Sequence, residues 1–254
     1  MYKFIDFFPP KVGEVIAFVG CGGKTSLIEG IITEWMDKGL PVLHTTTTKI
    51  YPPEGRKIIL GSDLHRLAED LRKAGDALIT AAAAYTLEDE CKLLGLPIGW
   101  FPMLKQVCSD YGIFVEADGC RGQSIKLYDD HEPCLPFEAD RIIILTGMDA
   151  FTCSRIAEKA HRYFLLQKSF PDISSYSLQE RVEILFHPKG LVGKLPKAIS
   201  KTLFLNKVTE ENLEQAKMIG DLLLEGAGAM LKGVMIGNTY EKPMIYAYKE
   251  QVLK

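Results

Sequence analysis

The chain has 254 residues, of which 47% are hydrophobic and 25% charged, and its 30 Lys and Arg residues against 33 Asp and Glu residues give a net charge of −3. This balance is typical of a globular protein and excludes a largely disordered chain. It also argues against a nucleic acid or an anionic membrane as partner, because a polyanion is attracted by a positive surface.

The N-terminal sequence and the cysteines indicate in which cellular compartment the protein is expected. No apolar run reaches the roughly 18 residues that a membrane span needs, and residues 1–14 lack the basic start, apolar stretch and cleavage site of a signal peptide. None of the six cysteines belongs to a CxxC pair, and six are too few for a disulfide framework. We therefore expect a cytoplasmic protein with reduced thiols.

Short apolar runs alternate with helical stretches along the chain, which predicts an α/β fold: a mostly parallel sheet with helices on both faces. The runs predict strands at residues 15–19, 41–46, 57–60, 77–82, 112–115, 142–145 and 202–205, and a hairpin from 233–236 and 244–248. Helices are predicted between the first strand and Gly39, after a cap at Ser62, and over 100–107 and 210–225.

Residues 150–200 differ from the rest because no strong strand pattern occurs there. The spacing predicts helices over 158–168 and 177–187. We predict a single P-loop α/β domain over residues 1–254, in which 150–200 forms a small helical insertion or lid.

The strongest motif lies between the first strand and the first helix. It reads Gly20, Cys21, Gly22, Gly23, Lys24, Thr25, Ser26. Glycines let backbone N–H groups approach a phosphate, Lys24 would contact the β and γ phosphates, and the Thr25 hydroxyl would bind Mg²⁺. Phe18 stands where the usual P-loop begins with glycine, so this is a shortened variant, closer to the G-x-x-G-K-T of nucleotide-dependent amide ligases. A plain strand-to-helix turn would explain the glycines but not the Lys–Thr pair.

Two carboxylates follow the strand at 112–115. Either Glu116 or Asp118 can bind Mg²⁺ beside Thr25, and the other can orient an attacking water. The simpler alternative is an acidic turn after a strand. Arg121 is a candidate for stabilising charge on the transferred phosphate, and an ordinary surface arginine is the equal alternative.

The second strand ends in four threonines and Lys49. Hydroxyls at this edge of the sheet, with Thr47 as the candidate, can contact a γ phosphate or Mg²⁺, and Lys49 can add positive charge. Threonines are also good strand formers, which is the simpler explanation of the run.

Asn206 and Lys207 resemble the start of the N-K-x-D element that reads guanine in GTPases. Thr209 stands in place of its aspartate, and a hydroxyl cannot accept two base N–H groups as a carboxylate does. We predict that Asn206 and Lys207 contact the nucleotide, and both ATP and GTP stay open. Thr209 also suits the cap of the next helix.

Three cysteines fall in or near the same loops. Cys21 and Cys120 are expected to converge on the nucleotide, with Cys134 nearby. Clustered thiolates can bind a soft metal, and small buried cysteines are the simpler interpretation. His131 and Glu132 are interpreted as a hydrogen-bonded loop feature.

Together these motifs resemble one family, the YqeC-type accessory proteins of selenium-dependent molybdenum hydroxylases. The matching segments are 18–26, 45–50, 116–119 with Arg121, Gly122 and Lys126, 131–133, 161–162, 187–190 and 205–207. The resemblance implies an accessory role in maturing such a hydroxylase or its cofactor. Cys21, Cys120, Cys134 and Thr209 depart from the family's pattern.

Our interpretation is a Mg²⁺-dependent nucleotide-binding P-loop protein that hydrolyses ATP or GTP and acts as a maturation factor, with Lys24, Glu116, Asp118 and Arg121 as catalytic candidates. One alternative is a small-molecule kinase or ATP-dependent ligase. Another is a nucleotide-gated chaperone or scaffold with negligible turnover that binds a partner through residues 150–200. The oligomeric state stays open.

Overall fold

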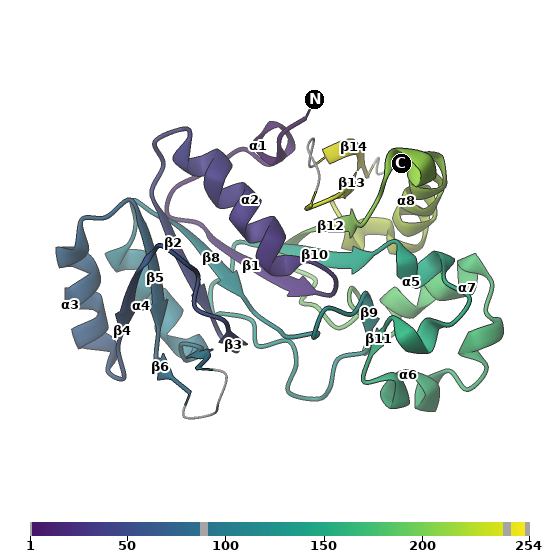
Figure 1. The fold of residues 1–254 in the computed structure, drawn as a ribbon, viewed down its shortest axis with the longest axis horizontal. Helices are drawn as coiled ribbons and strands as arrows, with labels where there is room; N and C mark the ends of the chain where they lie inside the picture. Colours follow the sequence, from purple (N-terminus) through teal and green to yellow (C-terminus); the bar gives the residue numbers. More distant parts are fainter. Residues whose placement is uncertain (1, 87–90, 241–244, 252–254) are drawn as a thin grey trace.

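A computed structural model describes residues 2–86, 91–240 and 245–251. Its centre is a sheet with the strand order β14-β13-β12-β10-β1-β8-β2-β5-β4 (Figure 1). In chain order the strands are β1 (Val15–Gly20), β2 (Val42–Thr46), β4 (Lys57–Leu60), β5 (Leu78–Ala82), β8 (Gly112–Glu116), β10 (Arg141–Gly147), β12 (Ser200–Asn206), β13 (Gly233–Gly237) and β14 (Ile245–Glu250). Only β14, which is antiparallel to β13, departs from parallel pairing within this sheet as described. The predicted α/β class is confirmed.

The remaining elements are helices and two small sheets. The helices are α1 (Phe4–Phe7), α2 (Lys24–Met36), α3 (Leu64–Ala74), α4 (Phe101–Val107), α5 (Asp149–Thr152), α6 (Tyr163–Ser169), α7 (Leu178–Glu183) and α8 (Leu213–Ala227). Beside the main sheet, β3 (Lys49–Ile50), β7 (Leu93–Leu94) and β6 (Ala84–Tyr85) form one small sheet, and β9 (Ile125–Lys126) pairs with β11 (Ala160–His161). No helix in the described ranges is both long and apolar enough to cross a membrane.

Helix α2 covers one face of the sheet. Its Trp35 packs edge-on against Phe114 of β8, with 5.0 Å between ring centroids, and Phe18 of β1 belongs to the same apolar cluster. Gly112 makes room for the indole, because a Cβ at this position would overlap the Trp35 ring. The C-terminal end of α2 is thereby held against the start of β8.

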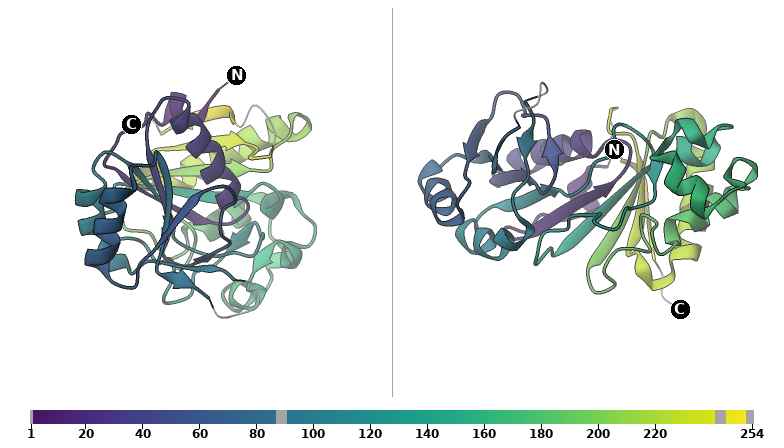
Figure 2. Two further views of the ribbon diagram at one scale, coloured as in Figure 1. Left: turned by 60° about the vertical axis from the view of Figure 1, so that its left-hand side comes forward. Right: turned by 90° about the horizontal axis from the view of Figure 1, so that it is seen from below.

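The opposite face is covered at both ends of the sheet. Helices α3 and α4 pack on β8, β2 and β5, and their residues Leu67 and Phe101 share an apolar cluster with Val115 of β8. At the other end α8 packs on β12 and β13, and Figure 2 shows α3 and α4 far from the α5–α8 group. Since both faces are covered, the central strands β1, β8 and β10 are largely apolar, which is why the sequence pattern predicts them.

Strand β1 lies where the chain changes direction across the sheet. After β1 the chain builds β2, β4, β5 and β8 on one side, and then crosses to β10 on the other side. Ligand sites in open α/β sheets lie at such a switch point, outside the carboxyl ends of the strands. The loops after β1, β8 and β10 meet there.

Some predicted boundaries are wrong. The helix after β4 is capped by Asp63 rather than Ser62, since the Asp63 side chain accepts a hydrogen bond from the backbone N–H of Arg66 at 2.9 Å. The first helix ends at Met36, and Gly39 is the last residue of the turn after it. The hairpin forms as β13 and β14, and its predicted residue Met244 lies outside the described residues.

The segment 150–200 is helical, as predicted, but the predicted helix over 158–168 is wrong at its start. Ala160 and His161 form β11 and pair with Ile125 and Lys126 of β9, so α6 begins only at Tyr163. A tertiary pairing with a distant segment takes the backbone groups that an earlier helix start would have used. The lid role of this segment stays a prediction.

Candidate functional site

Two glycines shape the loop at residues 20–26. Gly20 has a φ of 92°, and a Cβ there would overlap the carbonyl oxygen of Leu145. Gly23 has a φ of 112°, and a Cβ there would overlap the side-chain amide of Asn206. Both positions therefore require glycine, for backbone conformation and for space. The loop leads directly into the N-terminus of the 13-residue helix α2.

Lys24, the first residue of α2, is buried and faces two carboxylates. Its Nζ donates to the Gly20 carbonyl oxygen at 2.8 Å and lies 3.0 Å from Asp118 Oδ1 and 3.9 Å from Glu116 Oε1. Burial alone would lower the pKa of Lys24, but the nearby negative charges, Asp118 first, outweigh it and raise the pKa above its ordinary value. The site thus holds a buried ammonium group that is charged at neutral pH.

Thr25 and Glu116 bring a hydroxyl and a carboxylate together. Thr25 Oγ1 donates to Glu116 Oε2 at 3.0 Å, although Thr25 itself is exposed. The parallel register places Glu116 beside Phe18 of β1 and Thr46 of β2. Burial raises the pKa of Glu116, and Lys24 and Thr25 act against this rise.

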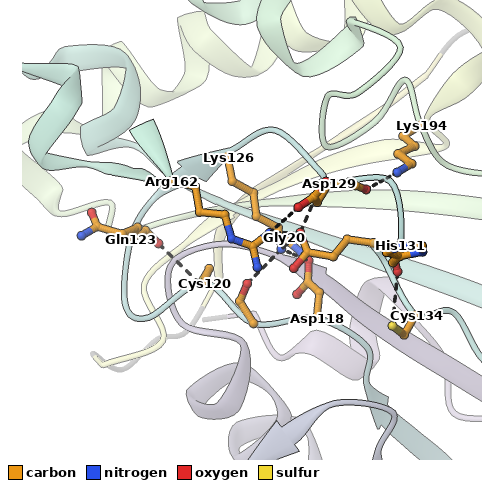
Figure 3. Close-up of polar contacts among 12 residues, drawn as sticks. Gly20, Asp118, Cys120, Gln123, Lys126, Asp129, His131, Cys134, Arg162 and Lys194 are labelled. Carbon is orange, nitrogen blue, oxygen red and sulfur yellow. Dashed lines mark hydrogen bonds and ion pairs between the residues drawn. The ribbon is translucent and has the colours of Figure 1, made fainter. Parts of the chain in front are cut away.

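A chain of ion pairs runs from the glycine-rich loop to helix α6 (Figure 3). Asp118 Oδ2 accepts the Gly20 N–H at 2.8 Å and lies 3.1 Å from the Nζ of Lys126. Lys126 in turn lies 3.5 Å from Glu132 Oε2, which is 3.1 Å from Arg162, the residue before α6. One network of charges therefore connects the loop after β1 with the loop after β8 and with the start of α6.

Cys120 places a sulfur atom against Lys24, with 3.7 Å from its Sγ to Nζ. The pKa of Cys120 is lowered to about 5, chiefly by a hydrogen bond from Cys21, against the effect of burial and with help from Lys24 and the Gly22 N–H. Burial raises the pKa of Cys21. Cys134 makes a hydrogen bond outside this pair of cysteines, since its Sγ lies 3.4 Å from the carbonyl oxygen of His131.

The threonine run ties neighbouring segments together. Three of its hydroxyls donate to main-chain carbonyl oxygens: Thr45 to Ala81 at 2.8 Å, Thr46 to Glu116 at 2.7 Å, and Thr47 to Cys134 at 2.6 Å. Lys49 lies in β3 of the small sheet and is exposed. The structure thus gives Thr47 a role in holding the loop at Cys134, and its nucleotide contact stays a prediction, as does that of Lys49.

Asn206 joins the glycine-rich loop from the end of β12. Its Nδ2 donates to the Gly22 carbonyl oxygen at 2.6 Å and to Thr239 Oγ1 at 3.1 Å, and its Oδ1 accepts from the Thr239 N–H at 2.9 Å. Nothing in the sequence relates Thr239 to Asn206, so sequence reasoning missed this partner. The side-chain amide of Asn206 is engaged within the protein.

Lys207 takes a different direction from Asn206. Its Nζ lies 2.6 Å from Ser124 Oγ and 3.2 Å from Asp149 Oδ2. Both partners are side chains of the protein, and they connect the end of β12 with the loop before β9 and with α5. The predicted contacts of Asn206 and Lys207 with a nucleotide stay predictions.

Besides Lys24, the second buried cation next to Asp118 is Lys126, whereas Arg121 is exposed in the left-handed region with a φ of 48°. Among the described residues we find no contact of the Arg121 side chain with Asp118. Lys126 did have a signal in the sequence, because it stands inside the short apolar stretch 125–128. The catalytic role predicted for Arg121 stays a prediction.

The part of the chain that contains this site matches a known protein family. The family model described as YqeC protein matches residues 16–163, which include the glycine-rich loop, both carboxylates and the ion-pair chain to Arg162. The chain belongs to the YqeC family. A relative from Escherichia coli (strain K12), described as "Uncharacterized protein YqeC", is 26% identical over 251 residues, which cover 95% of this chain and 93% of that protein. The resemblance expected from the sequence motifs is confirmed.

The YqeC family match includes Lys24 and Asp118, which the fold brings together at the switch point after β1. Asn206 and Thr239 lie beyond the matched residues and reach the same loop from β12 and from the turn after β13. The site is therefore assembled from both the matched and the unmatched part of the chain.

Proposed function

We propose that this YqeC-family protein is a Mg²⁺-dependent nucleoside triphosphatase that binds ATP or GTP at the carboxyl ends of β1 and β8. The observation that carries the proposal is the placement of Lys24, at the N-terminus of α2, directly against Asp118 and Glu116. A cation, a helix N-terminus and glycine backbone form a local positive site for phosphate. A net charge of −3 is no obstacle to such a site.

The residues present suit Mg²⁺. Among the described residues no three His, Cys, Asp or Glu side chains gather at one point, but Mg²⁺ commonly takes one or two carboxylates together with phosphate oxygens and water. Thr25 and Glu116, whose side chains are hydrogen-bonded to each other, offer the hydroxyl and carboxylate oxygens that this ion requires as ligands. We assign the ion to these two residues, where it would neutralise charge on the phosphates.

The two carboxylates have different surroundings, and this suggests different roles. Asp118 is fully buried and already faces two ammonium groups and the Gly20 N–H, so we assign it to holding the loop and the lysines. Glu116 is bonded to the exposed Thr25, and we assign it to the metal and the attacking water. Lys24 would exchange its Asp118 contact for the phosphate, while Lys126 keeps Asp118 neutralised.

We further propose that nucleotide turnover serves the maturation of a selenium-dependent molybdenum hydroxylase or its cofactor. This step is supported by the resemblance to YqeC-type accessory proteins and by membership of the family. The helical segment 150–200, which is connected to the loop after β8 through Glu132 and Arg162, is the part that we assign to partner contact.

The test is a thermal-shift and turnover experiment with ATP and GTP, each with and without Mg²⁺. Binding to the native state raises the melting temperature by mass action. We expect a shift and phosphate release for the wild type, and neither for Lys24→Ala. Lys38→Ala, an exposed lysine just after the same helix, is the matched control and should behave as the wild type. Equal binding by Lys24→Ala and wild type would overturn the proposal.

The same assay, repeated with a small acceptor or with a candidate partner protein added, separates the alternatives. A phosphorylated or amide product made only with a small acceptor would indicate a kinase or ligase. Nucleotide binding without turnover, together with capture of a partner, would indicate a scaffold.

A further inference from the structure

A cavity of about 370 Å³ opens in the helical segment, outside the ion-pair chain described above (Figure 1 shows α6 and α7). Its lining consists of four rings and two carboxylates: Phe170, Tyr176, Glu180, Glu183, Phe186 and His187. Phe170 follows α6, the two glutamates belong to α7, and His187 follows the turn Ile184–Phe186. A volume of this size is near the lower end of small-molecule sites.

The aromatic rings that line the cavity are steeply inclined to one another. Phe170 and Tyr176 have centroids 6.1 Å apart and planes inclined by 81°, and Phe170 and His187 have centroids 5.1 Å apart and planes inclined by 71°. Phe186 is held from outside, because a Cβ at Gly226 of α8 would lie 2.8 Å from its ring. Phe170, Tyr176 and Phe186 are only half-buried, so part of each ring is open to the cavity.

The charge of the lining is negative. Glu180 is fixed by Ser177, whose backbone N–H and hydroxyl each donate to its carboxylate at 2.7 Å, and Glu183 is exposed. Arg181 lies between them in sequence but points away, to the carbonyl oxygen of Cys153 at 2.7 Å. The Nδ1 of His187 accepts the Lys189 N–H at 3.1 Å.

Ring faces carry negative electrostatic potential and attract cations, most strongly where carboxylates stand beside them. A primary ammonium or a guanidinium group would need acceptors for all its N–H donors, and the ring walls offer few. A quaternary ammonium group has no N–H donors and requires only negative charge and ring faces. We propose that this cavity binds the alkylated ammonium group of a small molecule or of a methylated lysine.

The probes are choline and its carbon isostere 3,3-dimethylbutan-1-ol, which has the same shape without the charge, titrated into the full chain by calorimetry or ligand-observed NMR. We expect choline to bind and the alcohol not to bind. A peptide with trimethyl-lysine, titrated in parallel, distinguishes the two sources of the group by which probe binds more tightly. Absence of binding by both choline and the peptide, or equal binding of the alcohol, would overturn the proposal.

Variants test the lining. Tyr176→Leu removes a ring while keeping bulk, and Glu183→Gln removes a charge at an exposed position where folding is not at risk. Each should raise the choline dissociation constant about three- to tenfold. The matched controls are Phe164→Leu, whose ring is 65% exposed on α6 outside the cavity, and Glu225→Gln, an exposed position on α8. Equal weakening by the controls would contradict the assignment.

Discussion

Asp118 and Lys126 form an ion pair, with 3.1 Å between Oδ2 and Nζ, in which neither side chain is exposed to solvent. The other oxygen of the same carboxylate lies 3.0 Å from Lys24. One aspartate therefore neutralises two buried ammonium groups, and each of those charges would be costly in the interior without it. The loop after β1 is thus organised around Asp118 as much as around Lys24.

Replacing Asp118 by Asn should destabilise the protein by about 3–5 kcal/mol, because the change leaves two buried lysines without this counter-charge. Urea unfolding at pH 7 measures the effect. Asp76→Asn is the control, since Asp76 pairs with Lys57 at 2.5 Å near the surface and such pairs contribute at most about 1 kcal/mol. Equal losses for both variants would show that the buried pairs contribute no more than a surface pair.

Gly23→Ala should abolish nucleotide binding under the proposed function and also destabilise the fold. The new Cβ would overlap the Asn206 amide and would force alanine to a φ of 112°. Gly39→Ala, at a φ of 70° with open space around it, carries only the backbone strain of about 1–2 kcal/mol. We expect Gly23→Ala to cost roughly 1–3 kcal/mol more, as measured by urea unfolding. Similar values for the two variants would contradict the contact with Asn206.

Cys120 should react as a thiolate. With a pKa of about 5, its alkylation by iodoacetamide should change less than about twofold between pH 6 and 8, as followed at this residue by mass spectrometry. Cys21→Ala removes the main hydrogen bond to the sulfur, so the rate should become pH-dependent in that range. Cys108→Ala, a buried thiol in another part of the core, should leave the profile unchanged. A steep rise with pH in the wild type would refute the thiolate.

His44 should make stability depend on pH. Burial lowers the pKa of His44 from 6.5 to about 4, and Arg56 lies 3.4 Å from its Nδ1. Between pH 4 and pH 6.5 the unfolded chain binds a proton at His44 and the folded chain does not. The free energy of unfolding is therefore highest above pH 6.5, and it decreases as the pH falls towards 4. The loss is about 3 kcal/mol. His44→Gln should reduce the slope of unfolding free energy against pH in this range, and exposed His65→Gln should not.

The sheet could be predicted because its strands are buried on both faces. The runs that contain Phe18, Phe114 and Ile143 are apolar throughout, and no amphipathic alternation obscures them. The glycine-rich turn before Lys24 was equally predictable, since a left-handed backbone without space for a Cβ admits only glycine. These features depend on residues that are near one another in sequence.

Features that depend on distant residues could not be predicted. The local sequence pattern predicts a helix over 158–168, but the pairing of Ala160 with Ile125 delays the start of that helix. Asn206 meets Thr239 across 33 positions of sequence. The spacing of residues within a local motif does not show which distant segment of the chain packs against that motif.

The position of β1 has a consequence for biosynthesis. Its two neighbours in the sheet are β8, which begins at Gly112, and β10, which begins at Arg141. A nascent chain that has released only its first hundred or so residues therefore exposes both edges of an entirely apolar strand, and such edges are prone to pair with other chains. Contacts of this sequence separation also form slowly. The protein should accordingly depend on protection of β1 until the ribosome has delivered β10.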